Sequence, residues 1–69
     1  MKRWIVTFTD KGECRYASSH VCQAESIRGA VAQFEKGNFS VVTERFKGKA
    51  DTHRGWAYSK TRNYLVEQL

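Results

Sequence analysis

Four residues of this 69-residue chain have side chains that bind metals or act as nucleophiles: Cys14, His20, Cys22 and His53. Two thiols and two imidazoles are a sufficient ligand set for tetrahedral zinc. The spacing argues against such a site, because structural zinc sites usually place two cysteines two to four residues apart and Cys14 and Cys22 are eight positions apart. If residues 20–22 are extended, His20 and Cys22 share a face, which keeps a zinc-stapled module among the hypotheses.

The apolar run at residues 4–8 bears on the compartment in which the two cysteines reside. It is too short for a signal peptide or for a membrane span, so we expect a cytoplasmic protein that does not associate with a membrane. Cytosolic thiols stay reduced, which disfavours a disulfide between Cys14 and Cys22. Redox or nucleophilic catalysis would need a thiol with a lowered pKa and a base beside it, and closeness in sequence does not establish that contact. We favour cysteines that act as small hydrophobic residues, with no metal and no cofactor.

Other arrangements for catalysis are missing from the sequence. Carboxylates are not paired in an apolar setting, and no Ser-His-Asp arrangement can be argued from spacing. The segment GKADTHRG at residues 48–55 lacks the Lys-Ser/Thr ending of a phosphate-binding loop. A chain of this length also offers little room for a closed pocket. We therefore predict a binding protein and not an enzyme.

The positive charge of the chain is concentrated near its C-terminal end. The net charge is +5, and residues 45–62 hold six basic residues against one acidic residue, so the rest of the chain balances. A local excess of positive charge attracts polyanions, and nucleic acid is the first such partner to consider. An acidic protein surface is the second, and a solvated charged segment without a partner is the third.

Aromatic rings alternate with the basic residues in this segment. Cations neutralise phosphates, and aromatic faces stack on unpaired bases. On a strand, Arg54, Trp56 and Tyr58 would share one face, joined by Lys60 if the strand continues. The alternative is that Trp56 and Tyr58 point into the core, and that the cations are merely solvated at the edge of the sheet. The predicted nucleic-acid-binding residues are Arg45, Lys47, Lys49, Arg54, Trp56, Tyr58, Lys60 and Arg62.

The elements that would position these residues follow from the pattern of apolar side chains. The pattern predicts a strand at residues 3–9, and a turn at Gly12 that leads into a returning strand at 14–17. A polar bend is expected at 18–20, after which the strand resumes at 21–24. Ser26 is a typical N-cap for a helix that continues through Lys36 and ends at Gly37. Residues 39–47 predict a further strand, 48–55 a polar loop, 56–59 a short strand, and 63–67 a last strand.

This order predicts a single α+β domain over residues 1–69, in ββαββ order. The sheet should be largely antiparallel, with three to five strands and one helix packed on one face. The helix contributes an apolar face at the helical spacing i, i+3, i+4, i+7. The predicted core consists of Trp4, Val6, Phe8, Ile27, Ala30, Val31, Phe34, Val41 and Leu65.

The first half of the chain resembles the small N-terminal arm-binding domain of phage integrases. The matching features are the Asp10-Lys11-Gly12 turn and a following helix that contains Ala30 and Phe34. That family reads DNA with its sheet, and the resemblance carries this role only to Lys11 and Arg15. Cys14 and residues 18–20 depart from the basic second strand that is usual in the family.

The whole chain resembles small accessory proteins of lambdoid prophages. The features that carry this likeness are the length, the Met-Lys-Arg-Trp-Ile-Val start and the Gly-Trp-Ala-Tyr segment at residues 55–58. The resemblance implies a cytoplasmic bacterial prophage protein that is linked to chromosome replication or integrity, and it supplies no site residues. We thus expect a non-enzymatic accessory protein, a monomer or homodimer, that associates with nucleic acid, first of all DNA. The alternative is a phage-type modulator that inhibits a host protein through an edge strand or a basic face.

Overall fold

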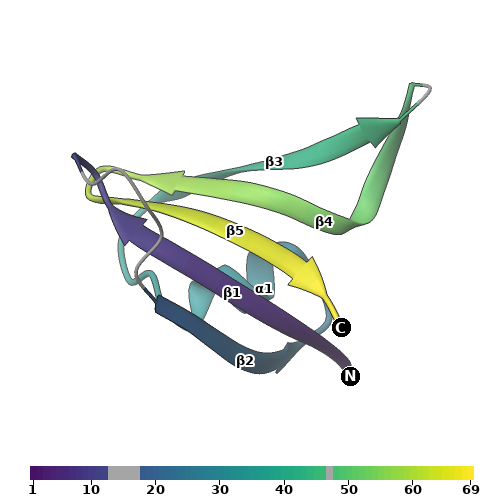
Figure 1. The fold of residues 1–69 in the computed structure, drawn as a ribbon, viewed down its shortest axis with the longest axis horizontal. Coiled ribbons are helices and arrows are strands. Elements are labelled where there is room, and N and C mark those ends of the chain that lie inside the picture. The colour runs from purple at the N-terminus through teal and green to yellow at the C-terminus, as the bar shows by residue number, and fades with distance from the viewer. Residues whose placement is uncertain (13–17, 47) are drawn as a thin grey trace.

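The fold is one antiparallel sheet with a single helix on one face (Figure 1). The computed structural model describes residues 1–12, 18–46 and 48–69. For residues 44–46 and 49–52 it describes the backbone alone. Over these residues the elements are β1 (Lys2–Asp10), β2 (Ser18–Ala24), α1 (Ile27–Ala32), β3 (Phe39–Phe46), β4 (Lys49–Ser59) and β5 (Arg62–Gln68). The strands lie in the order β2-β1-β5-β4-β3, and each neighbouring pair is antiparallel. The predicted α+β class is confirmed, with five strands in ββαβββ order.

The bounds of two predicted strands are wrong. β2 runs without interruption from Ser18 to Ala24, where a bend at 18–20 was expected, and the strand predicted at 14–17 lies outside the described residues. β4 starts at Lys49, so residues 49–55 belong to a strand and not to a polar loop. They do so because β3 and β4 form one long hairpin, in which Phe46 pairs with Lys49 and Thr43 pairs with Gly55.

The helix is also shorter than predicted. Ser26 is the N-cap, as expected, and its hydroxyl accepts a hydrogen bond from the N–H of Gly29 at 3.1 Å. The helix ends at Gln33, whose side chain donates to the carbonyl of Gln23 in β2 at 2.7 Å, so Gly37 is not its C-terminal cap. Among the described helices none is long and apolar enough to span a membrane.

The core lies between α1 and the sheet. Trp4 and Val6 of β1 are fully buried beside Val66 of β5, and the Trp4 indole N–H donates to the Ala24 carbonyl at 2.9 Å. Ile27, Ala30 and Val31 of the helix close the core from above, and Phe8, Phe34 and Val41 pack at its margin. Leu65 does not belong to it.

The correction at Leu65 follows from the register of β5. Val66 pairs with Val6, and Tyr64 pairs with Phe8, so Tyr64 and Val66 face the helix and both are fully buried. Leu65 lies between them in the strand and therefore faces the other side of the sheet. The sequence Tyr-Leu-Val is apolar at all three positions, so it does not by itself say which residues turn inward.

Where β4 packs against the helix, its inward side chains are small. Gly55, Ala57 and Ser59 are buried on this face, and Ala57 lies opposite Tyr64 in β5. A Cβ at Gly55 would lie 2.8 Å from the Val42 carbonyl oxygen and 3.1 Å from Cδ1 of Ile27. Gly55 therefore lets Ile27 and the β3 backbone approach β4 closely.

The segment after α1 is attached to the β4–β5 hairpin through Glu35. The carboxylate accepts from the Gly37 N–H at 3.0 Å and from the Tyr64 hydroxyl at 3.1 Å. Hydrogen bonds from the Ser59 hydroxyl and from the Gly37 N–H, with smaller contributions from Tyr64 and Arg62, lower the pKa of Glu35. Burial raises the pKa of Tyr64, which keeps its hydroxyl protonated and able to donate.

We predict that Gly55→Ala destabilises the protein by about 1–3 kcal/mol, because the new methyl group overpacks the contact with Ile27 and the β3 backbone. Chemical denaturation of both proteins measures the difference. Gly29→Ala is the matched control: a Cβ there meets nothing closer than 3.4 Å, so the same change inside the helix should stabilise by about 0.5–1 kcal/mol. Equal effects of the two substitutions would contradict the packing at Gly55.

The lowered pKa of Glu35 predicts an acid-sensitive contribution to stability. A carboxyl whose folded pKa lies below its unfolded value, here 4.5, stabilises the fold above that pH and loses this effect as the pH falls through the folded pKa. Glu35→Gln should therefore lower the midpoint of thermal unfolding at neutral pH, and the gap from the wild type should close under acid. Glu25→Gln, at an exposed carboxylate outside this network, should show no such gap.

Candidate nucleic-acid interface

The face of the sheet opposite α1 has no element of the described chain packed on it, and it is called the open face here. Strand alternation and register place one row of side chains across all five strands on it. The row consists of Ser19, Thr7, Leu65, Trp56 and Val42. On one side of it lie Val21, Ile5, Glu67 and Arg54, and on the other lie Asn63, Tyr58 and Ser40.

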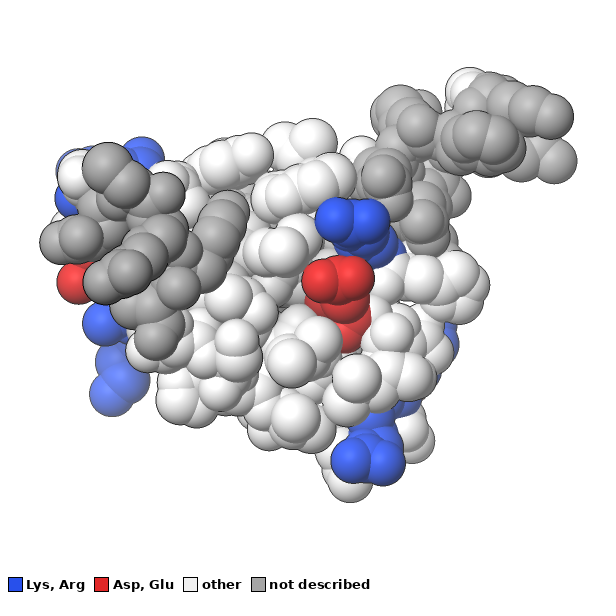
Figure 2. Space-filling model, viewed as in Figure 1, with Lys and Arg blue, Asp and Glu red and all other residues white. Residues whose placement is uncertain are grey.

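The open face exposes large apolar side chains. The exposed fractions are 58% for Val21, 50% for Val42 and 43% for Tyr58, while Ile5, Leu65 and Trp56 are half-buried by their neighbours. Figure 2 shows this face as a broad uncharged surface with cationic groups at its margins and one basic group against one acidic group within it. Apolar surface that is contiguous and solvent-exposed marks interaction sites in soluble proteins.

Arg54, Trp56 and Tyr58 share the open face of β4, as the sequence predicted. The Arg54 guanidinium carbon lies 5.7 Å from the Trp56 ring centroid, within the range of a cation–π contact. Arg54 Nε also lies 4.0 Å from a carboxylate oxygen of Glu67, and both side chains are about half exposed. A pair this exposed contributes little to stability, so Arg54 is available to exchange Glu67 for an external anion.

Trp56 is therefore neither a core residue nor a fully exposed one. It pairs with Leu65 on one side and with Val42 on the other, and its half-buried side chain lies between those of Arg54 and Tyr58 along β4. Residues two apart in a strand lie about 6.8 Å apart, so the two rings form adjacent stacking positions. The alternative that both rings point into the core is wrong.

The other predicted binding residues are placed differently. Lys60 is exposed in the turn between β4 and β5, because β4 ends at Ser59 and does not carry it onto the open face. The backbones of Arg45 and Lys49 lie in the far part of the β3–β4 hairpin, where side chains are not described. Lys47 lies outside the described residues.

Arg62 lies on the opposite side of the sheet. Its register with Asp10 places it with Tyr64 and Val66 on the helix face, where its guanidinium lies 4.8 Å from the Phe8 ring centroid. Its Nε donates to the Asp10 carboxylate at 3.2 Å. Through these contacts Arg62 stabilises the end of the sheet. The structure does not bring it together with Arg54, Trp56 and Tyr58.

The cysteine and histidine residues do not converge within the described part of the chain. His20 and Cys22 share the helix face of β2, but the His20 ring is stacked on Phe8 at 5.3 Å and burial raises the pKa of the Cys22 thiol. His53 is in β4, two strands beyond β1, where Nδ1 is hydrogen-bonded to the Gln68 side chain at 2.6 Å. No group of three potential metal ligands forms among the described residues, and Cys14 lies outside them.

Sequence reasoning missed the aliphatic part of the open face, namely Ile5, Val21, Val42 and Leu65. The sequence of β4 does contain a signal that tells the two faces of the sheet apart. Small residues at 55, 57 and 59 alternate there with large ones at 54, 56 and 58. Comparisons with family models, with curated proteins and with solved structures give no match for this chain. The resemblances to phage proteins therefore stay predictions.

The two tryptophans should differ in solvent access. Trp4 is fully buried, whereas Trp56 lies on the open face beside Arg54. Trp56→Phe should remove most of the fluorescence quenching by acrylamide and shift the remaining emission to shorter wavelength. Arg54→Gln should weaken quenching by iodide more than quenching by acrylamide, because the guanidinium attracts the anion. Strong residual quenching in Trp56→Phe would contradict the assignment of Trp56 to the open face.

Proposed function

We propose that this protein is a non-enzymatic accessory protein that binds single-stranded nucleic acid on its open face. The observation that carries the proposal is the group of Arg54, Trp56 and Tyr58, which lie next to one another on a sheet face that no helix of the described residues covers. The prophage resemblance adds a cytoplasmic setting and an effect on host chromosome replication or integrity, for which DNA is the expected form of the ligand.

The geometry favours unpaired bases over a duplex. Bases in a duplex are already stacked on each other, whereas two rings about 6.8 Å apart on a strand can each receive one base of an extended single strand. Trp56 is half-buried between Leu65 and Val42, which restricts its ring and reduces the entropy lost on binding.

Positive charge near the rings supports the same ligand. Arg54 lies against Trp56, Arg3 is exposed on the open face of β1, and Lys60 and Lys11 are exposed at the turns that end β4 and β1. Lys11 and Lys60 lie at the same end of the sheet, where the Lys11 N–H donates to the Thr61 carbonyl at 2.8 Å, whereas Arg3 pairs with Gln23 near the opposite end of β1. Cations at the margin of an apolar face can pair with phosphates while the bases contact the rings.

The aliphatic residues of the open face favour a second candidate, a modulator of a host protein. Val21, Ile5, Leu65 and Val42 offer no hydrogen bonds to bases, and apolar contact of this kind is typical of protein interfaces. β3 is also an edge strand among the described strands, to which a partner strand could add. An acidic host protein would meet the same cations.

Binding to fluorescently labelled single-stranded DNA, duplex DNA and single-stranded RNA at physiological salt tests the proposal. Single strands should bind at micromolar concentration or tighter, and duplex should bind less tightly. Trp56→Leu and Tyr58→Leu should each weaken binding at least about fivefold, since stacking contributes about 1–3 kcal/mol per base. Arg54→Gln should weaken binding and reduce its salt dependence.

Matched variants on the other side of the sheet serve as controls. Phe39→Leu removes a ring that packs against the core, and Lys36→Gln removes an exposed cation in the segment after α1. Neither should change binding once the fold is confirmed by circular dichroism. Absence of binding to all three nucleic acids would overturn the proposal in favour of the host-protein candidate, as would equal losses in the control variants.

A further inference from the structure

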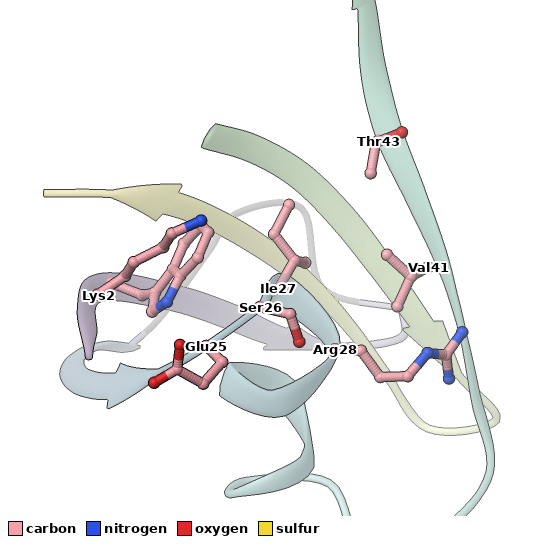
Figure 3. Close-up of a pocket in the computed structure, with 8 residues that line it drawn as sticks. Lys2, Glu25, Ser26, Ile27, Arg28, Val41 and Thr43 are labelled. Atoms are coloured by element: carbon pink, nitrogen blue, oxygen red, sulfur yellow. The ribbon is translucent and has the colours of Figure 1, made fainter. Parts of the chain in front are cut away.

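A cavity of about 320 Å³ lies on the helix side of the sheet, away from the open face (Figure 3). It lies where α1 begins, between the start of β1 and the middle of β3. The residues that line it are Lys2, Trp4, Glu25, Ser26, Ile27, Arg28, Val41 and Thr43. Its volume is at the lower end of the range for small-molecule sites in proteins.

The walls of the cavity are apolar. Trp4 and Ile27 form the floor of the cavity but are almost fully buried already, and the Trp4 indole N–H is bonded to the Ala24 carbonyl at 2.9 Å. Ile27 is held against Gly55, and Val41 packs against the core from β3. A hydrocarbon group that entered this space would displace water mainly from the part-buried Val41 and from the stems of Lys2 and Arg28, and each methylene of the group that is buried contributes about 0.8 kcal/mol.

The rim of the cavity carries charge of mainly one sign. Lys2 and Arg28 lie on opposite sides of the space in Figure 3, with Ile27 between them. The Arg28 guanidinium lies 5.3 Å from the Phe39 ring centroid, so its side chain is held across towards β3. Glu25 is the one carboxylate in the lining, which leaves an excess of one positive charge, and the Ser26 and Thr43 hydroxyls add hydrogen-bonding groups.

We propose that this cavity binds a small monocarboxylate with a hydrocarbon chain, with the chain over Ile27 and against Val41 and the carboxylate at the rim, paired with Lys2 or with Arg28. Apolar walls select the chain, and two cations from different elements select the anionic end. The volume admits one short chain and not a folded partner. The site does not depend on the proposed binding of nucleic acid, because the two lie on opposite sides of the sheet.

Titration with octanoate, monitored through the methyl NMR signals of Ile27 and Val41, tests the site. Octanol and octylammonium are the matched probes. Octanoate should bind about tenfold more tightly than octanol, which has the chain without the charge, and octylammonium should bind least tightly. Hexanoate should bind roughly 15-fold less tightly than octanoate, because it buries two fewer methylenes.

Two sets of variants separate the charge from the cavity. Lys2→Gln with Arg28→Gln should reduce octanoate affinity to that of octanol, whereas Lys11→Gln with Lys36→Gln, which removes two exposed cations elsewhere, should not. Val41→Phe, verified as folded by its NMR spectrum, should fill the space and weaken octanoate and octanol alike. Equal affinity for octanoate and octanol in the wild type would overturn the proposal. So would shifts that occur first at Val21, Val42 and Leu65, or no shifts at millimolar octanoate.

Discussion

The helix can lie against β4 only because the side chains that β4 turns towards it are small. At Gly55 there is no room for even a methyl group between Ile27 and the β3 backbone, and Ala57 lies directly opposite the buried ring of Tyr64. Strand alternation then forces the large neighbours, Arg54, Trp56 and Tyr58, to the other face. The packing of the core and the composition of the open face thus both result from the alternation of small and large residues along β4, and neither can change without the other.

The same alternation gives similar residues opposite roles. Arg54 and Arg62 both lie near an aromatic ring and a carboxylate, but Arg62 joins the ends of β1 and β5 beside the partly buried Phe8. Arg54 lies over a ring on the open face, and its contact with Glu67 at 4.0 Å is long and about half exposed. The first arginine is committed to holding the sheet, while the second can rearrange around an anion at little cost.

Much of this fold could be predicted from the sequence, because β1, the N-cap at Ser26 and the inward face of α1 follow directly from local patterns. The orientation of β5 could not, since Tyr64, Leu65 and Val66 are all apolar and only pairing with Val6 and Phe8 selects which turn inward. The early end of α1 also depends on distant partners, because Gln33 bonds to β2 and Glu35 bonds to Tyr64. The extended conformation at residues 49–55 depends on pairing with β3, which outweighs a polar sequence with a glycine at its end. For the candidate site, the spacing of Arg54, Trp56 and Tyr58 in the sequence was enough to predict that they share a face. That Arg62 lies on the other face follows only from the pairing of β5 with β1.

The short helix also explains why an open face remains. A helix of six residues covers only part of one side of a five-stranded sheet, and no other element among the described residues lies on the opposite side. Val21 and Val42, which are at least half exposed, therefore gain little from burial within the monomer. They would gain it from a ligand that covers them. The surface that no described element covers is therefore the one best suited to binding, so affinity for a partner and stability of the bound sheet should rise together.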